Sequence, residues 1–384
     1  MSSRIRDSED IVIVGAYRTP ICKAKRGGLS GAKNDVLVSE VIKGTLKKTG
    51  LKPEHIQEVV LGHGLSPLNG TTSLRMGVLR AGIPLQVPVS TCNRQCASGL
   101  ESLSVLFNKI KLNQIEIGLG GGFESMTGYS LPLSDAIVLN GDQKQVVDCT
   151  LPMGGTAEIL ARKHNVSRSK CDVFAFTSHE KSLKAQKQGK YKSEIVTVQV
   201  ENRMVYEDDC IRETSIEKLK SLRPVFALEG VCTAGNSCQL ADGASAIIMM
   251  KRKTAEEMNI TPKAAVVDYV VVGVEPSVMG EGPVPAVREI LRRNNLEMKD
   301  ISYFEINEAF AAQTVYCIEE LGVDYNKVNL YGGSIALGHP IGSTGSRLVC
   351  TLLNVMKTEG IRGYAIATLC VGTGFGAALL LWIE

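Results

Sequence analysis

Cys96 stands just before a predicted helix, a position that favours a reactive thiol. The segment after it carries apolar residues at three- and four-residue steps, the spacing of one buried helix face: Leu100, Leu103, Leu106, Phe107 and Ile110. Unpaired amide N–H groups in a first helical turn stabilise an anion, so we expect them to lower the pKa of the thiol from about 8.5. The chemistry indicated is nucleophilic attack; the alternative is that Cys96 is a small buried residue of the core.

Two further groups near the C-terminus fit the same chemistry. His339 precedes Pro340 and a predicted helix over about 343–356, and Cys370 follows a predicted strand over 364–369 and is itself followed by glycines. A thiol nucleophile needs a base within hydrogen-bond distance, and neutral histidine is the usual one. A second thiol can carry a proton to and from carbon, and the N–H groups of glycines can approach an oxyanion. Taken singly, a His-Pro pair or a glycine-rich segment is typical of a turn, but the three groups together suit carbon–carbon chemistry at a thioester.

The elements that must position these groups repeat along the chain. The helix after Cys96 leads to a predicted strand over 115–120 that ends in glycines, as the helix after His339 leads to the strand before Cys370. Such self-similarity indicates a duplicated unit. If the halves pack as pseudo-twofold partners, Cys96 and His339 lie at matching helix starts and face one another. Strands that alternate with helices predict a largely parallel α/β sheet.

The middle of the chain has another character. From residue 127 to about 235 charge is more frequent and glycine-ended strands are fewer, with predicted helices over 153–190. We interpret this part as an inserted domain. The predicted organisation is therefore an N-terminal half over 1–126, completed by about 236–262, an inserted domain over 127–235, and a C-terminal half over 263–384.

The composition is that of an ordinary soluble globular protein. The chain has 384 residues, of which 44% are apolar and 22% charged, and a net charge of +3, which gives no indication of nucleic-acid binding. Its 11 cysteines are odd in number and lack the paired Cys-x-x-Cys spacing of zinc sites, so we expect a reducing compartment and no metal. No apolar run of about 18 residues is present, so no membrane insertion is expected, and the first ten residues lack the apolar stretch of a secretory signal.

Four motifs, in order, resemble those of the thiolase family, most closely its peroxisomal 3-ketoacyl-CoA thiolase type. The matching segments are Asn93–Leu100 around the nucleophile, Asn307–Ala311, Gly332–Pro340 around the histidine, and Cys370–Gly376 around the second cysteine. The resemblance runs from Ile11 to the end of the chain. It implies a five-layered αβαβα fold of two similar halves with an inserted loop domain that helps to bind coenzyme A.

The resemblance also implies roles for individual residues. Cys96 would attack the 3-keto carbon, His339 would take its proton, and Cys370 would protonate the departing acetyl-CoA carbanion and then deprotonate the incoming coenzyme A. Asn307 would hold a water that forms one oxyanion hole with His339, and the backbone amides of Cys96 and Gly372 would form the other. No metal or redox cofactor is implied, and coenzyme A is a co-substrate.

Contacts to the substrate are expected from four residues, namely Arg223, Met153, Cys238 and Phe310. Cys238 stands where relatives commonly have a serine, and a thiol is a poorer donor. Pro152 and Thr373 match the peroxisomal type, whereas Phe375 replaces the usual methionine. Four further histidines, His55, His63, His164 and His179, lie in no motif and are interpreted as surface or satisfied core residues.

Several alternatives stay open at this point. An acetoacetyl-CoA thiolase working in condensation would use the same catalytic residues, and a non-catalytic lipid-binding paralogue would have the same fold. A ketoacyl synthase would need a second histidine where Cys370 stands. The family type implies a homodimer or a tetramer, and the peroxisome as compartment. An N-terminal peroxisomal import signal has Arg-Leu, five residues and then His-Leu, and at this spacing the chain has Arg4-Ile5 and Ile11-Val12, which do not match. The end Leu381–Glu384 does not match a Ser-Lys-Leu signal, so the cytoplasm is the alternative.

Overall fold

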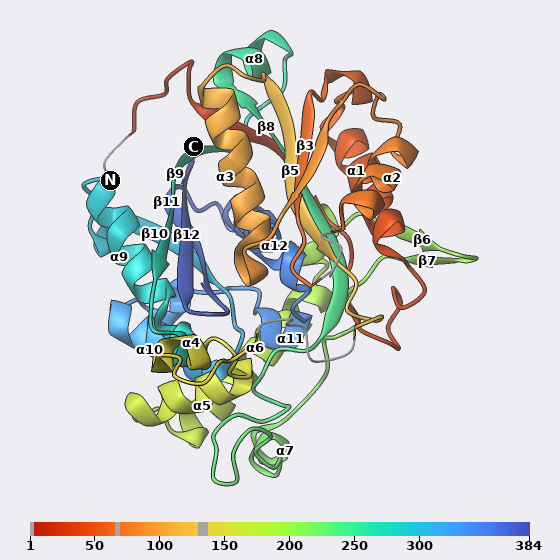
Figure 1. The fold of residues 1–384 in the computed structure, drawn as a ribbon. Coiled ribbons are helices and arrows are strands. Elements are labelled where there is room, and N and C mark those ends of the chain that lie inside the picture. The colour runs from red at the N-terminus through yellow and green to blue at the C-terminus, as the bar shows by residue number, and fades with distance from the viewer. Residues whose placement is uncertain (1–3, 66–69, 130–136) are drawn as a thin grey trace.

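A computed structural model describes residues 4–65, 70–129 and 137–384 of the chain (Figure 1). The strands are β1 (Ile11–Arg18), β2 (Cys22–Lys23), β3 (Glu58–Gly62), β4 (Val89–Cys92), β5 (Ile117–Glu124), β6 (Val198–Val200), β7 (Arg203–Val205), β8 (Ala241–Lys251), β9 (Ala264–Gly273), β10 (Ile301–Ile306), β11 (Gly363–Val371) and β12 (Phe375–Ile383). The α-helices are α1 (Asn34–Thr49), α2 (Thr71–Arg80), α3 (Ser98–Lys111), α4 (Lys144–Asp148), α5 (Met153–Lys163), α6 (Arg168–Lys187), α7 (Ile216–Lys220), α8 (Arg252–Glu257), α9 (Pro283–Arg293), α10 (Ala311–Leu321), α11 (Ser334–Leu337) and α12 (Ile341–Thr358). Short 3₁₀ helices are η1 (Pro53–His55), η2 (Gln95–Ala97), η3 (Lys190–Ser193), η4 (Pro276–Glu281), η5 (Met298–Asp300) and η6 (Tyr325–Lys327).

Ten of the described strands form one mixed sheet. Its order is β10-β11-β12-β9-β1-β8-β5-β3-β4, and β2 pairs with β8. The prediction of a largely parallel sheet is wrong, because only β3 with β4 and β5, and β10 with β11, pair in parallel. A three-residue turn with Thr373 (φ 65°) and Gly374 (φ 96°) joins β11 to β12, and so short a connection allows only an antiparallel pair.

The predicted duplication is confirmed in this strand order. From the centre outwards, β1, β8, β5 and β3 correspond to β9, β12, β11 and β10, with two antiparallel pairs followed by a parallel one in each half. The halves meet where Val12 pairs with Ala265 and Ile13 with Ala264. The Cys96 and His339 segments therefore occupy equivalent places in the two halves.

Helices cover both halves and fill the space between them. In Figure 1, α1 and α2 lie on one side, α9 and α10 on the other, and α3 and α12 between the two groups of strands. The buried apolar residues follow the same division. One cluster joins α3 and α12 to both halves of the sheet, a second lies under α1 and α2, and a third lies under α9 and α10. This is the layered arrangement expected of the fold.

The two central helices approach each other through glycines. A Cβ atom added to Gly99 of α3 would lie 2.6 Å from the backbone nitrogen of Ser346 in α12, and one added to Gly345 would lie 2.6 Å from the nitrogen of Leu100. β5 continues through the glycines expected to end it, because these pair with β3 and β8. A side chain at Gly122 would meet the carbonyl oxygen of Gly342, in the first turn of α12. Small residues thus bring β5, α3 and α12 together where α3 and α12 begin.

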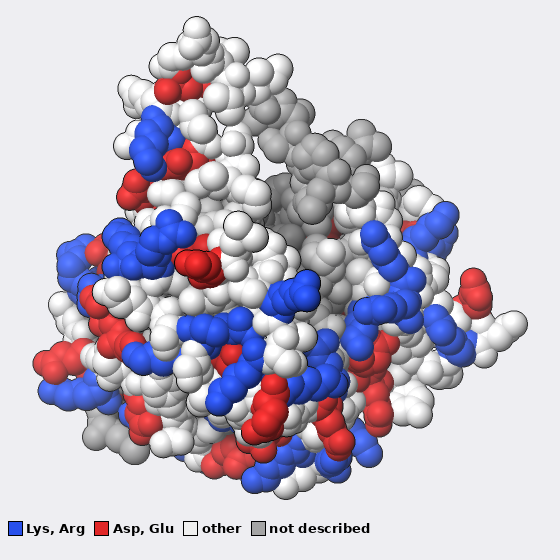
Figure 2. All heavy atoms as spheres, turned by 90° about the horizontal axis from the view of Figure 1, so that it is seen from below, with Lys and Arg blue, Asp and Glu red and all other residues white. Residues whose placement is uncertain are grey.

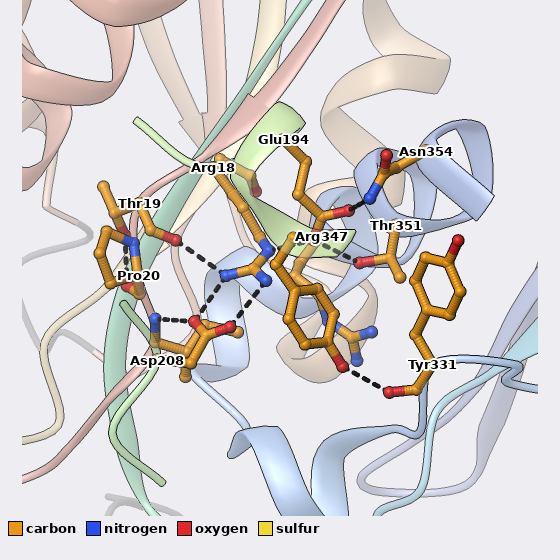
Figure 3. Close-up of polar contacts among 12 residues, drawn as sticks. Arg18, Thr19, Pro20, Glu194, Asp208, Tyr331, Arg347, Thr351 and Asn354 are labelled. Atoms are coloured by element: carbon orange, nitrogen blue, oxygen red, sulfur yellow. Dashed lines mark hydrogen bonds and ion pairs between the residues drawn. The ribbon is translucent and has the colours of Figure 1, made fainter. Parts of the chain in front are cut away.

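The segment over 127–235 is joined to the rest by buried ion pairs (Figure 3). The Arg18 guanidinium of β1 donates to Asp208 with two nitrogens, at 2.7 and 2.9 Å, and to Glu194 at 2.6 Å. Glu194 also accepts hydrogen bonds from Thr351 and Asn354 of α12, at 3.1 and 2.7 Å. The boundaries of the inserted domain remain a prediction, but these contacts link the segment to both halves.

No helix among the residues placed by the structure is long and apolar enough to cross a membrane.

The helix crossing can be tested with Gly99→Ala. The new methyl group has no room against the α12 backbone, so we expect a loss of about 1–3 kcal/mol in the free energy of unfolding. Gly155→Ala in α5 is the matched control, because the nearest atom to its added Cβ is 4.0 Å away and alanine favours a helix by about 1 kcal/mol. Urea unfolding measures both, and equal midpoints for the two variants would contradict the close crossing.

Candidate active site

A tight turn places Cys96 between β4 and α3. Gln95, Cys96 and Ala97 form a 3₁₀ turn, and α3 begins only at Ser98, so Cys96 precedes the α-helix. Gln95 adopts a positive φ of 45°, and its N–H donates to the side-chain oxygen of Asn93 at 2.8 Å. The strand end and the asparagine therefore fix the course of the backbone before the thiol.

His339 lies in a second turn, between α11 and α12. Gly338 has a φ of 96°, and a side chain there would press on Ala241 and Cys210. The His339 N–H donates to the carbonyl oxygen of Gln239 at 2.9 Å. The imidazole is buried, as the prediction of a site between the halves requires.

The two turns bring the thiol and the imidazole into hydrogen-bond contact. His339 Nε2 lies 3.3 Å from Cys96 Sγ, and His339 Nδ1 lies 2.6 Å from Thr344 Oγ1. The Thr344 hydroxyl donates to the carbonyl oxygen of Pro340 at 2.9 Å, so its oxygen accepts from Nδ1–H. Nε2 then carries a lone pair directed at the thiol, which is the tautomer that a general base needs.

Burial sets the resting charges of this pair. It raises the pKa of Cys96 to about 11, although a hydrogen bond from the Gly372 backbone acts in the opposite direction. Burial, helped by the positive charge of Arg347, lowers the pKa of His339 to about 3. The expectation that a helix start lowers the thiol pKa is wrong, because Cys96 sits in a 3₁₀ turn and desolvation outweighs the amide dipoles. The resting pair is a thiol and a neutral imidazole.

The end of β11 supplies the second thiol and a backbone donor. Cys370 is buried, and burial followed by the nearby Cys96 raises its pKa well above the usual value. A side chain at Gly372 would run into Gln95 Oε1 and would come within 3.3 Å of Met153 Sδ. Glycine at this position therefore lets β11, the Cys96 turn and the start of α5 meet at one place.

Asn307 follows β10 and is completely buried. Its side-chain oxygen accepts a hydrogen bond from Ser334 Oγ at 2.6 Å, and Arg347 Nη2 donates to the same Ser334 oxygen at 2.8 Å. The Asn307 Nδ2 donor has no partner among the described residues. A buried donor that is left free by its neighbours is suited to a bound oxygen atom.

The four residues expected to contact the substrate divide into two groups. Burial, followed by the nearby Cys96, raises the pKa of Cys238 to about 12, and Cys238 in turn contributes to the raised pKa of Cys370. The Cys238 N–H donates to the carbonyl oxygen of Ala309 at 3.0 Å. Phe310 packs edge-on against Phe226, with ring centroids 5.9 Å apart. Met153 approaches Gly372, and both Met153 and Phe310 belong to one apolar cluster with Cys370, so three of the four residues lie around the thiols. Arg223 lies on the surface and forms no hydrogen bond or ion pair with the described residues.

Sequence reasoning missed the residues that orient this site. Thr344, Ser334 and Gln95 each contact a residue of the motifs, and each lies within or beside a motif already singled out. Proximity in the sequence was the available signal, but their partners are decided by the packing. Across the described ranges, no three His, Cys, Asp or Glu side chains are grouped so as to hold a metal ion.

The protonation states predict a pH profile for alkylation of Cys96 by iodoacetamide. Because its raised pKa leaves little thiolate at neutral pH, the rate should rise roughly tenfold per unit between about pH 7 and about pH 9. No step is expected near pH 6.5, since His339 stays neutral above its lowered pKa. Peptide mapping by mass spectrometry follows the modification, and a plateau already reached at neutral pH would contradict the assignment.

Comparisons with known proteins agree with this geometry. Two family models match the chain, "Thiolase, N-terminal domain" over residues 11–253 and "Thiolase, C-terminal domain" over residues 260–382. The chain is 50% identical over 372 residues to the peroxisomal 3-ketoacyl-CoA thiolase of Encephalitozoon cuniculi, covering 97% of this chain and 95% of the relative. Its structure is similar to the dimeric peroxisomal thiolase of Saccharomyces cerevisiae (TM-score 0.93, 37% identity, 99% of each chain). It is also similar to human mitochondrial 3-ketoacyl-CoA thiolase in complex with CoA (TM-score 0.89, 34% identity, 98% of each chain). The chain belongs to the thiolase family.

Proposed function

We propose that this chain is a 3-ketoacyl-CoA thiolase. It cleaves a 3-ketoacyl-CoA with coenzyme A to acetyl-CoA and an acyl-CoA two carbons shorter, the thiolytic step of fatty acid β-oxidation. The observation that carries the proposal is the 3.3 Å contact of Cys96 Sγ with the unprotonated Nε2 of His339. The names of the thiolase relatives support the substrate class.

In the first half of the reaction, His339 Nε2 takes the proton of Cys96 as the sulfur attacks the 3-keto carbon. The bond between this carbon and the neighbouring carbon breaks, and the electron pair leaves with acetyl-CoA. The Cys370 thiol gives its proton to that carbanion. The acyl chain remains as a thioester on Cys96, and Cys370 becomes a thiolate.

The second half returns every group to its resting state. The Cys370 thiolate takes the proton of an incoming coenzyme A thiol, and the resulting thiolate attacks the thioester carbon. Cys96 leaves and regains its proton from His339. The high pKa of Cys370 suits a group that must hold its proton until a carbanion forms, since a strong base removes it readily.

Two sets of donors can stabilise the negative oxygen that develops in each half. The free Nδ2 of Asn307, through a water, and protonated His339 serve one oxyanion, and the N–H groups of Gly372 and Cys96 serve the other. Each such donor contributes roughly 3 kcal/mol to the transition state in enzymes of this kind.

Two further properties follow from the family. The similar yeast structure is described as dimeric, and β4 is the last strand of the sheet, so its outer edge is free among the described strands to pair with a second copy. We infer a homodimer. The relative from E. cuniculi is named peroxisomal, and the chain is assigned to the peroxisome by this resemblance.

Thiolysis by the purified protein tests the function directly. Loss of the magnesium–enolate absorbance of 3-ketoacyl-CoA substrates of increasing chain length should show turnover, and Cys96→Ala should reduce it by about 10³-fold or more. Cys92→Ala is the matched control, because this neighbouring thiol donates to the carbonyl oxygen of Ser98 and has no histidine partner among the described residues.

The outcomes separate the candidate functions. Turnover of long chains that is lost with Cys96 supports the proposal. Activity on acetoacetyl-CoA alone would instead indicate a short-chain thiolase, and a folded protein without turnover of any substrate would indicate a non-catalytic paralogue.

The inserted segment is proposed to bind coenzyme A. Figure 2 views the molecule from the end where α5 and α7 lie in Figure 1, and Lys and Arg side chains gather there with Asp and Glu among them. Two lysines of the inserted segment already have partners: Lys187 pairs with Glu213 at 3.1 Å, and Lys181 donates to the carbonyl oxygen of Val328 at 3.1 Å. Arg223 has no such partner in the part of the chain that the structure describes, which leaves its guanidinium available to a phosphate.

Arg223→Ala should therefore raise the KM for coenzyme A several-fold and leave kcat near the wild-type value, because the lost contact is equal in the ground and transition states. Steady-state kinetics with coenzyme A as the varied substrate measures both constants. Lys52→Ala, which removes an exposed charge before η1, serves as the control. An unchanged KM would remove Arg223 from the binding site.

A further inference from the structure

Glu124 is a buried carboxylate between the two turns of the active site. It is the last residue of β5, and one oxygen, Oε2, accepts two backbone N–H groups, from Gly64 at 2.8 Å and from Gly342 at 3.0 Å. Neither Gly64 nor Gly342 has a proposed catalytic role. The two donors belong to different halves of the chain.

The donor Gly342 lies in the first turn of α12. The first N–H groups of a helix have no partner within it, and Pro340, which precedes α12, offers no capping side chain. Glu124 satisfies the N–H of Gly342 from outside the helix, and its negative charge is favourable at that end. His339 stands three residues before Gly342, so this hydrogen bond holds the end of the helix from which the imidazole projects.

The donor Gly64 is linked to the Cys96 turn by hydrogen bonds. The Gly64 carbonyl oxygen accepts a hydrogen bond from Asn93 Nδ2 at 3.0 Å, and the Asn93 side-chain oxygen accepts the N–H of Gln95 at 2.8 Å. The path from Glu124 through Gly64 and Asn93 therefore ends one residue before Cys96. The negative charge of Glu124 also contributes to the raised pKa of Cys96, which places the carboxylate within electrostatic reach of the sulfur.

His63 lies against the other carboxylate oxygen, Oε1, which has no hydrogen-bond partner among the described residues. Its Nδ1 donates to the carbonyl oxygen of Phe123 at 3.1 Å and lies 2.9 Å from Glu124 Oε1, and its ring stacks on Phe123 with centroids 4.5 Å apart. Nε2 has no partner within the described residues, so the interpretation as a satisfied core histidine holds for one ring nitrogen only.

We propose that Glu124 is a positioning residue that sets the distance between Cys96 and His339 by holding both turns on one carboxylate oxygen. It contacts neither the sulfur nor the imidazole. The inference rests on the proposed function for its catalytic consequence, but its structural part concerns the Cys96–His339 pair alone. A displacement of about 1 Å between reacting groups can cost about 10²-fold in rate.

Three variants test the proposal. Glu124→Ala removes both acceptors, whereas Glu124→Gln keeps one carbonyl oxygen for the two N–H groups. Glu158→Ala is the matched control, because Glu158 is likewise buried and its carboxylate accepts two backbone N–H groups, from Val231 at 2.9 Å and Cys232 at 2.8 Å, on the inserted segment. For each variant, kcat and KM for thiolysis, the rate of Cys96 alkylation by iodoacetamide at fixed pH, and the melting temperature are measured.

We expect Glu124→Ala to lower kcat by about 10²-fold at a nearly constant KM, and Glu124→Gln to recover most of it. Both variants remove the negative charge that contributes to the raised pKa of Cys96, so their alkylation rates are compared with each other, and Glu124→Ala should be alkylated about 10²-fold more slowly than Glu124→Gln. Glu158→Ala should lower the melting temperature but keep kcat and the alkylation rate. The proposal is overturned if folded Glu124→Ala keeps the wild-type kcat and is alkylated as fast as Glu124→Gln, or if the two alanine variants lose kcat equally. Should Glu124→Ala fail to fold, Asn93→Ala decides, because it removes the link between Gly64 and Gln95 and leaves Glu124 in place. A clear loss of kcat and of the alkylation rate supports the path from Glu124 to the Cys96 turn, and wild-type rates overturn it.

Alkylation needs no acyl-CoA, so it reports on the positioning even if the chain proves to turn over no 3-ketoacyl-CoA. A failure of the proposed function would appear in the wild-type thiolysis assay, whereas a failure of this inference would appear in the comparison of variants.

Discussion

The close approach of α3 and α12 near their first turns is the constraint on which the site depends. Two helices with ordinary side chains lie about 8–10 Å apart, but Gly99 and Gly345 leave room only for backbone against backbone. Each helix is preceded by a turn that carries one member of the Cys96–His339 pair. If the helices moved apart by the width of a methyl group, Cys96 and His339 would no longer be within hydrogen-bond distance.

Charge buried beneath the site completes what packing begins. Arg347 of α12 is enclosed with Glu305, 3.6 Å from it, and burial raises the pKa of this glutamate to about 8. The arginine repels a proton from His339 and, through Ser334, turns the amide of Asn307 so that its donor is free. The cation thus adds to the effect of burial in keeping the His339 imidazole neutral, and it directs a hydrogen-bond donor; both effects depend on exclusion of water.

Much of this could be predicted from the sequence, because apolar spacing and glycine placement are local signals. They predicted the helix after Cys96, the helix after His339, the strand before Cys370 and the duplication that makes the two turns face one another. The antiparallel course of β8 and β12 was not predicted, since strand direction depends on partners distant in the chain. The raised pKa of Cys96 and the roles of Thr344 and Glu124 were missed for the same reason: burial and hydrogen-bond partners are properties of the packed structure.

The buried ion pairs of Arg18 have a consequence for the order of events during synthesis. Glu194 and Asp208 follow Arg18 by 176 and 190 residues, and β8, which lies between β1 and β5, ends only at Lys251. An arginine buried without its carboxylates costs about 3–5 kcal/mol. The first 126 residues therefore cannot complete their sheet on the ribosome until about two thirds of the chain has emerged, and the N-terminal half matures only after the segment inserted into it.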